Sequence, residues 1–235
     1  MCAVIYWTDQ YKYVNTNFVP LATKIKIGHY VGEMTSLQTS QTPGRGRPRK
    51  FDEEAVLDRL TELFWDKGYE ATSMADILDA SGLQKSSLYN AFGSKDALFR
   101  KILSRYIETR MEAFADMAEA HNQADISALH AFLDAVFSFG RAGCLAVNTT
   151  TELGASDEGI SSLAQIYRQQ IRVALQKVVR AATAGRSQAS ALVESRTEML
   201  LGFLLGYAVA ARTGASDKEM NGFADAAHGI VKEWA

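Results

Sequence analysis

The segment from Ser81 to Asp96 reads SGLQKSSLYNAFGSKD and decides the fold prediction. Its apolar residues Leu83, Leu88 and Phe92 are spaced to anchor one face of a short helix. A glycine precedes this helix and another follows it, which limits the helix to about two turns. The remaining side chains are short and polar, and helical spacing directs them away from the anchored face.

A second short helix precedes this segment. Met74, Ile77 and Leu78 have helical spacing, and either Thr72 or Ser73 can cap the helix at its start. Two short helices joined by a three- or four-residue turn that contains glycine are the signature of a helix-turn-helix. The sequence therefore predicts a helix-turn-helix in this region.

Longer helices are predicted on both sides of the pair. The chain from Phe51 has an apolar stripe at helical spacing that ends at Gly68. Ser94 caps a longer helix with Leu98 and Ile102 on one side. The whole region predicts a helix, a short helix, a tight turn, a second short helix and a long helix.

The polar face of the second short helix suits the major groove of DNA. An asparagine such as Asn90 can pair bidentately with adenine, and Ser86 and Ser87 can contact any base. Lys85 and the hydroxyl of Tyr89 suit phosphate oxygens, as do the N–H groups that begin the next helix. The predicted DNA-binding residues here are Thr72, Ser73, Lys85, Ser86, Ser87, Tyr89, Asn90 and Lys95.

A basic segment, GRGRPRK, lies just upstream, although the net charge of the whole chain is only −2. Its Arg45, Arg47, Arg49 and Lys50 can follow a minor groove or the DNA backbone, because glycine and proline keep the segment extended. A solvated linker is the alternative interpretation. Beside a helix-turn-helix, the DNA-binding arm is favoured.

Residues 45–98 resemble the DNA-binding domain of the TetR/AcrR family of bacterial transcriptional regulators. The matching text is FWDKGYEATSMADILDASGLQKSSLYNAFGSKDALF. The resemblance implies an all-α homodimer with helix-turn-helix heads and a larger ligand-binding body. Gln84 stands where the family often has a serine or threonine cap, and Ala91 where histidine or tyrosine is common. The first departure is expected to weaken the start of the helix, and the second removes one expected DNA contact and so leaves the operator preference open.

Composition supports an all-α protein without cofactors. The chain is 47% hydrophobic and 22% charged and has three prolines. Its two cysteines are far apart, which excludes a disulfide framework or a cysteine metal cluster and suits a reducing cytoplasm. The apolar window from Met199 to Ala211 is too short to span a membrane, so we expect a buried helix and no membrane partner.

We expect three parts: an N-terminal extension and linker (1–43), the helix-turn-helix domain (44–98), and an effector-binding and dimerisation domain (99–235). Residues 1–33 are either an extra element or sequence upstream of a native start at Met34. The expected helices of the third part are Ile126–Arg141, a short piece within Ala142–Gly154, Ser156–Ala184, Glu194–Arg212 and Asp217–Trp234. No catalytic constellation occurs in it, which argues against an enzyme.

Gly202, Gly206 and Ala210 give one helix a small face that lets another helix approach closely. They pack either within one subunit or across the dimer axis, and the family resemblance favours the dimer. A dimer would place two recognition helices on a palindromic DNA operator.

The sequence favours a homodimeric repressor that binds such an operator and is released by a small-molecule effector. Candidate effector-binding residues are Phe114, Phe137, Phe139, Cys144, Asn148, Glu152, Tyr167 and Arg168. Cys144 is either a small buried hydrophobic residue or a reactive thiol. The second reading gives an alternative function, a sensor of oxidants or electrophiles that releases DNA.

Overall fold

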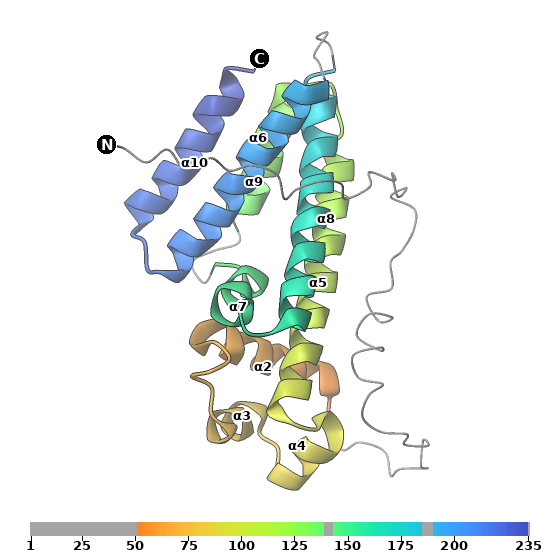
Figure 1. Ribbon diagram of the computed structural model, residues 1–235, viewed down its shortest axis with the longest axis vertical. Helices are drawn as coiled ribbons and strands as arrows, with labels where there is room; N and C mark the ends of the chain where they lie inside the picture. The colour runs from red at the N-terminus through yellow and green to blue at the C-terminus, as the bar shows by residue number, and fades with distance from the viewer. Residues whose placement is uncertain (1–50, 139–142, 185–189, 235) are drawn as a thin grey trace, which may run out of the picture. The chain divides into compact units, whose positions relative to one another are not determined.

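The computed structural model describes residues 51–138, 143–184 and 190–234, and all regular elements in these ranges are α-helices. The basic arm, Phe139 and residues 1–33 lie outside them. The helices are α2 (Glu53–Lys67), α3 (Met74–Ser81), α4 (Lys85–Phe92), α5 (Lys95–Ala120), α6 (Ile126–Phe137), α7 (Leu145–Leu153), α8 (Glu158–Ala182), α9 (Ser190–Arg212) and α10 (Asp217–Lys232) (Figure 1). The all-α prediction is confirmed.

Local capping chemistry sets the ends of the short helices. Ser73 and Asp76 form a capping box at the start of α3, and Gly82 ends that helix in the left-handed conformation with φ of 66°. Gln84 precedes α4 and makes no side-chain cap hydrogen bond. The departure from a serine or threonine cap therefore leaves the start of α4 without a side-chain acceptor.

Aromatic and aliphatic residues from several helices form the core under the helix-turn-helix. The side chains of Phe64, Ile77, Leu88 and Phe99 are at most 1% exposed. The rings of Phe64 and Phe99 lie 4.9 Å apart and tilted, an arrangement that aromatic pairs favour. The hydrophobic anchors of α3 and α4 are thus buried against α2 and α5.

The long helix α5 joins the helix-turn-helix region to the body. It runs without interruption through residues 98 and 99, where we expected a domain boundary. In the body, α8 packs against α5 and α9, and α6 packs against α8 and α10 (Figure 1). Among the described helices, none is long and apolar enough to cross a membrane.

Candidate DNA-binding surface and effector cavity

Side-chain contacts hold the first short helix of the pair in place. Arg59 on α2 donates hydrogen bonds to the carbonyl oxygens of Ala80 and Ser81, across 3.0 Å each, and so satisfies the end of α3. At the other end, Lys67 pairs with Asp76 at 2.7 Å. The hydrogen bonds from Lys67 and Ser73 hold the pKa of Asp76 well below its usual value.

The second short helix, α4, presents the predicted polar face to solvent. Lys85, Ser86, Tyr89 and Asn90 are exposed, while Ser87 lies at the half-buried margin. Tyr89 keeps 42% of its surface exposed, although it is a large aromatic residue. The outward orientation is as expected, and DNA contact by these side chains stays a prediction.

Three other predicted DNA-binding residues have structural partners. Thr72 is fully buried and donates its hydroxyl to the carbonyl oxygen of Gly68 at 2.6 Å, so its assignment as a DNA contact was wrong. The hydroxyl of Ser73 serves the capping box. The ammonium group of Lys95 lies 4.4 Å from the centre of the Tyr69 ring, where a cation–π interaction orients it.

A cavity of about 50 Å³ lies in the body, between α5, α6, α7, α8 and α9. Most of its lining is aliphatic or aromatic, and one guanidinium, one thiol and three phenol groups also line it. The lining residues are Tyr106, Arg110, Phe114, Val136, Gly143, Cys144, Val147, Tyr167, Ile171, Leu204, Leu205, Tyr207 and Ala208. Such an apolar wall with a few polar groups is typical of a small-molecule site.

Two tyrosine hydroxyls meet the thiol at the cavity wall. The Sγ atom of Cys144 lies 3.5 Å from the Tyr106 hydroxyl and 3.3 Å from that of Tyr167. The Tyr106 oxygen also accepts a hydrogen bond from the N–H of Leu145, which begins α7. Burial, followed by the neighbouring Cys144, raises the pKa of both tyrosines, so both hydroxyls keep their protons at neutral pH.

The cavity also touches the helix-turn-helix region through aromatic contacts. Trp65 on α2 packs edge-on against Tyr106, with ring centres 5.2 Å apart. The guanidinium of Arg110 lies 5.2 Å from the Tyr106 ring centre and 5.7 Å from the Trp65 ring centre. Two residues of the cavity wall, Tyr106 and Arg110, therefore contact Trp65 of α2.

Comparison with known proteins agrees with this architecture. Residues 56–102 match the family model described as bacterial regulatory proteins, tetR family. The repressor ComR of Escherichia coli K12 is 33% identical over 178 residues, covering 73% of this chain and 85% of ComR. This chain belongs to the TetR family. It is therefore a DNA-binding transcriptional regulator and not an enzyme.

Other relatives agree with the TetR assignment. The repressor BdcR of Escherichia coli K12 is 39% identical over 84 residues, which cover 36% of this chain and 42% of BdcR. A cysteine mutant of the TetR-family regulator CifR, solved with 26-bp double-strand operator DNA, is 26% identical with a TM-score of 0.63. That alignment covers 78% of this chain and 98% of CifR.

The predicted effector residues divide by position in this TetR-family chain. Phe114, Cys144 and Tyr167 line the cavity. Phe137, Asn148, Glu152 and Arg168 do not line it, and these four expectations are corrected. Phe137 packs on the ring of Tyr207, Asn148 is buried within α7, Glu152 contacts the turn before α3, and Arg168 is exposed on α8.

Sequence reasoning missed three polar lining residues. Tyr106 and Arg110 follow Ile102 at intervals of four along α5, so extending the stripe from Ile102 would have found them. Tyr207 gave no comparable signal, because it lies within a long apolar run of α9.

The small face of α9 is partly open. Gly202 is exposed and a methyl group added there would meet no atom within 4 Å, whereas one at Gly206 would lie 3.6 Å from the Phe223 ring on α10. Ala210 is half-buried. Gly206 therefore packs within the subunit, and Gly202 faces outward.

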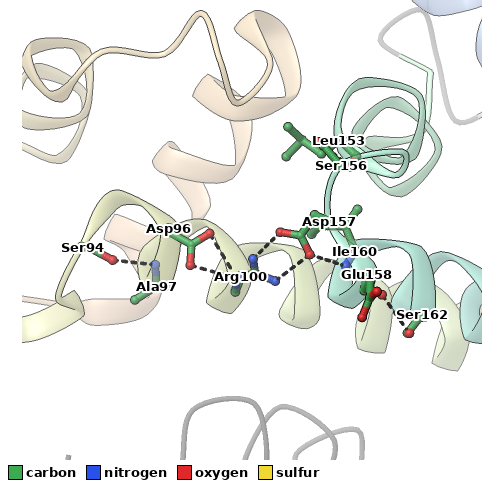
Figure 2. A network of polar contacts seen from close by, with 10 residues as sticks. All are labelled: Ser94, Asp96, Ala97, Arg100, Leu153, Ser156, Asp157, Glu158, Ile160 and Ser162. Atoms are coloured by element: carbon green, nitrogen blue, oxygen red, sulfur yellow. Dashed lines mark hydrogen bonds and ion pairs between the residues drawn. The ribbon is translucent and has the colours of Figure 1, made fainter. Parts of the chain in front are cut away.

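Three polar contacts tie the body to the helix-turn-helix region. The Glu152 carboxylate on α7 accepts hydrogen bonds from the backbone N–H groups of Tyr69 and Glu70, at 3.1 and 2.8 Å. Arg212, at the end of α9, donates to the carbonyl oxygens of Trp65 and Asp66 in the last turn of α2. Figure 2 shows the third contact, in which Arg100 on α5 binds Asp157, the cap of α8, at 2.5 Å.

No group of three or more histidine, cysteine, aspartate or glutamate side chains suited to a metal ion occurs in the part of the chain that the structure describes.

Proposed function

We propose that this TetR-family chain is a homodimeric repressor that binds a palindromic operator and leaves it when a small effector occupies the cavity. The observation that carries the proposal is the exposed polar face of α4, held on buried Leu88 and Phe92. An α-helix fits the major groove, and amide and hydroxyl side chains can read base edges there. Asn90, Ser86 and Ser87 are assigned to bases, and Lys85, Tyr89 and Lys95 to phosphates.

The outward face of α9 supports the homodimer. Leu192, Met199 and Val209 are exposed large hydrophobic residues on this helix. Together with Gly202 they fall within one side of it by helical spacing, so a second copy can cover them. A two-fold dimer then presents two copies of α4 about 34–36 Å apart, one turn of DNA.

The cavity limits the kind of effector. Its volume of about 50 Å³ is well below the roughly 150 Å³ of a cavity that admits benzene. An effector is therefore either a molecule of a few heavy atoms or one that pushes the lining helices apart. The apolar wall favours a largely apolar molecule, and Arg110 together with the tyrosines favours one hydrogen-bond acceptor on it.

The first test measures binding of the purified protein to the DNA that flanks its own gene, over a salt series and with nonspecific DNA as competitor. We expect tight, competitor-resistant binding to a palindrome. The Tyr89→Ala, Lys95→Ala double variant should bind much more weakly, with Glu62→Gln on the exposed side of α2 as the control. Unchanged affinity of the double variant would refute the assigned contacts.

A second test addresses the cavity. A panel of small apolar molecules is screened for a rise in Tm and for release of the DNA. Ala208→Val, which narrows the cavity, should abolish both effects of an active molecule and leave DNA binding intact. A molecule that releases DNA from both proteins alike acts elsewhere.

The position of Cys144 supports the thiol sensor as a second candidate. Its Sγ atom lies at the cavity wall between two hydroxyls, so a reagent that enters the cavity meets the thiol. The test compares DNA release by N-ethylmaleimide in a Cys2→Ser protein and in the same protein with Cys144→Ser. Release only from the protein that retains Cys144 supports the sensor, and equal release excludes it.

A further inference from the structure

Two histidines from different helices meet ring to ring in the body. The Nδ1 atoms of His130 on α6 and His228 on α10 lie 2.6 Å apart. The rings are nearly parallel, with an interplanar angle of 17° and centres 4.9 Å apart. His228 also places Nε2 2.9 Å from the Oδ1 atom of Asp134 on α6. The contact thus joins α10 to α6 at two points.

The hydrogen-bond pattern assigns the protons. Asp134 accepts from Nε2 of His228, so a neutral His228 has its lone pair on Nδ1. His130 must then donate its Nδ1–H to that lone pair. With both rings neutral, every facing nitrogen has a partner, and the pair forms a directed chain from His130 through His228 to Asp134.

Protonation changes this chain of hydrogen bonds in two steps. The first can go to Nε2 of His130 and leave the bond between the rings intact. The second must go to Nδ1 of His228, where two N–H groups would face each other across 2.6 Å. Two cations at this separation repel, and neither ring keeps an acceptor for the other.

The groups around the pair do not offset two positive charges. Asp134 carries a single charge, and its side chain is 72% exposed. On α9, Tyr207 uses its hydroxyl to donate to the carbonyl oxygen of Phe137, whose ring lies edge-on to His228. Within one turn of His228 on α10, the charged residues are Asp225 and Lys232, whose opposite charges cancel. On α8, which packs against α6, Arg172 and Lys177 are paired with glutamates.

We propose that the His130–His228 pair is a proton-operated contact that holds α10 on α6 at neutral pH and loosens it in acid. The inference about α10 itself depends only on this contact. Its effect on DNA binding rests on the proposed function, because α10 packs against α9, the helix proposed to meet its copy across the dimer axis.

The direction of the pH dependence follows from the pKa of His130, which burial and the adjacent His228 lower. A histidine whose pKa is lower in the folded protein binds more protons when the contact is open. The contact is therefore at full strength above the pKa of an unfolded histidine, about 6.5, and weakens as the pH falls from there through the lowered pKa.

The test is hydrogen exchange of the full-length protein, read by mass spectrometry on peptides from Asp217–Lys232 at pH 7.5 and pH 5.0 and corrected for intrinsic exchange rates. The wild type should lose protection in acid, by up to about tenfold per pH unit for each additional proton that the open form binds. His130→Asn and His228→Gln each remove one charge and should reduce this loss.

The matched control is His121→Asn. His121 is half-buried and follows α5 as its C-cap, and its Nδ1 atom lies 2.7 Å from the carbonyl oxygen of Met117 on that helix. It should behave as the wild type does. The proposal is overturned if the wild type keeps its protection at pH 5.0, or if the paired variants lose as much as the control. The readout needs no DNA, so a failure to bind an operator leaves it unaffected.

Discussion

The carboxylate of Glu152 accepts the backbone N–H of Tyr69 across 3.1 Å and thereby joins α7 to the turn that precedes α3. The same carboxylate accepts the N–H of Glu70. At its other end, α7 begins beside Cys144, a residue of the cavity wall. One short helix therefore contacts both the cavity and the helix-turn-helix region.

Replacing Glu152 with alanine should leave the turn without its acceptors. We expect the free energy of unfolding to fall by about 1 kcal/mol, since the carboxylate is exposed and water replaces part of the lost bonding. DNA binding should weaken as well, because the turn positions α3. Urea denaturation and DNA titration measure the two effects. Glu112→Gln, at an exposed carboxylate in the middle of α5, is the control and should change neither.

Gly68→Ala should be destabilising by about 1–2 kcal/mol, because Gly68 has φ of 85°, where a side chain is strained. The added methyl carbon would also lie 2.9 Å from an oxygen of Glu152. In a double-mutant cycle with Glu152→Ala, the part of the destabilisation caused by the steric contact should disappear, and the part caused by backbone strain should remain. Strictly additive effects would show that the carboxylate moves aside without cost.

Breaking the Arg100–Asp157 pair should produce a stability loss that depends on pH. Burial alone would raise the pKa of Asp157, but the bonds from Arg100 and from the N–H of Ile160 outweigh it and lower the pKa. The pair therefore stabilises the fold above the carboxyl's ordinary pKa of about 3.8, and this contribution fades as the pH falls through the lowered value.

Arg100→Gln should accordingly lower the free energy of unfolding by about 1 kcal/mol at pH 7, allowing for solvent screening. The difference from the wild type should shrink as the pH falls below the carboxyl's ordinary pKa of about 3.8 and through the lowered value. Denaturation at several pH values measures it. Asp96→Asn removes only the other carboxylate that Arg100 binds (Figure 2). That carboxylate is half exposed, so its loss should cost less. A loss independent of pH would contradict the assignment.

Gly202→Arg should shift the protein from dimer to monomer if α9 pairs across the two-fold axis. Gly202 is exposed and has open space around it, so the arginine does not disturb the subunit itself. Analytical ultracentrifugation gives the mass, and DNA titration the accompanying loss of affinity. Ala115→Arg, on the exposed side of α5, should remain dimeric. An unchanged mass for Gly202→Arg would place the interface elsewhere.

Two substitutions on α4 should separate base reading from phosphate binding. Asn90→Ala should cost about 1–3 kcal/mol on the preferred operator and relax the preference at one base pair. Lys85→Ala should weaken binding to all sequences alike and reduce the salt slope by about 0.9. Competition titrations against single-base operator variants distinguish the two outcomes. Equal effects on every sequence from both variants would refute the assigned division.

Local patterns predicted the helix-turn-helix because its signals are short-range. Capping at Ser73, the left-handed glycine at Gly82 and the anchors of α4 all lie within about 20 residues of one another. The same patterns wrongly assigned Thr72 to the DNA-binding surface. A hydroxyl beside a helix cap can also turn inward to a backbone carbonyl, as it does here.

The effector cavity was predicted less well, since five helices far apart in the sequence build it. Cys144 and Tyr167 were selected for their chemistry and do line it. Glu152 was selected on the same grounds, yet its partners are backbone groups more than 80 positions away. Helical periodicity shows which side of a helix is buried and gives no information on which distant helix covers it.

Because α5 is unbroken from the helix-turn-helix region to the cavity, a tilt of this helix at the cavity would displace its first turn. From Tyr106 at the cavity to Lys95 at its first turn, the helix spans about 17 Å, so a tilt of roughly 5° about the cavity end moves the other end by about 1.5 Å. That displacement is half the length of a hydrogen bond. In the proposed dimer, two copies of the helix would move in opposite senses about the two-fold axis, so the mismatch with the DNA would double.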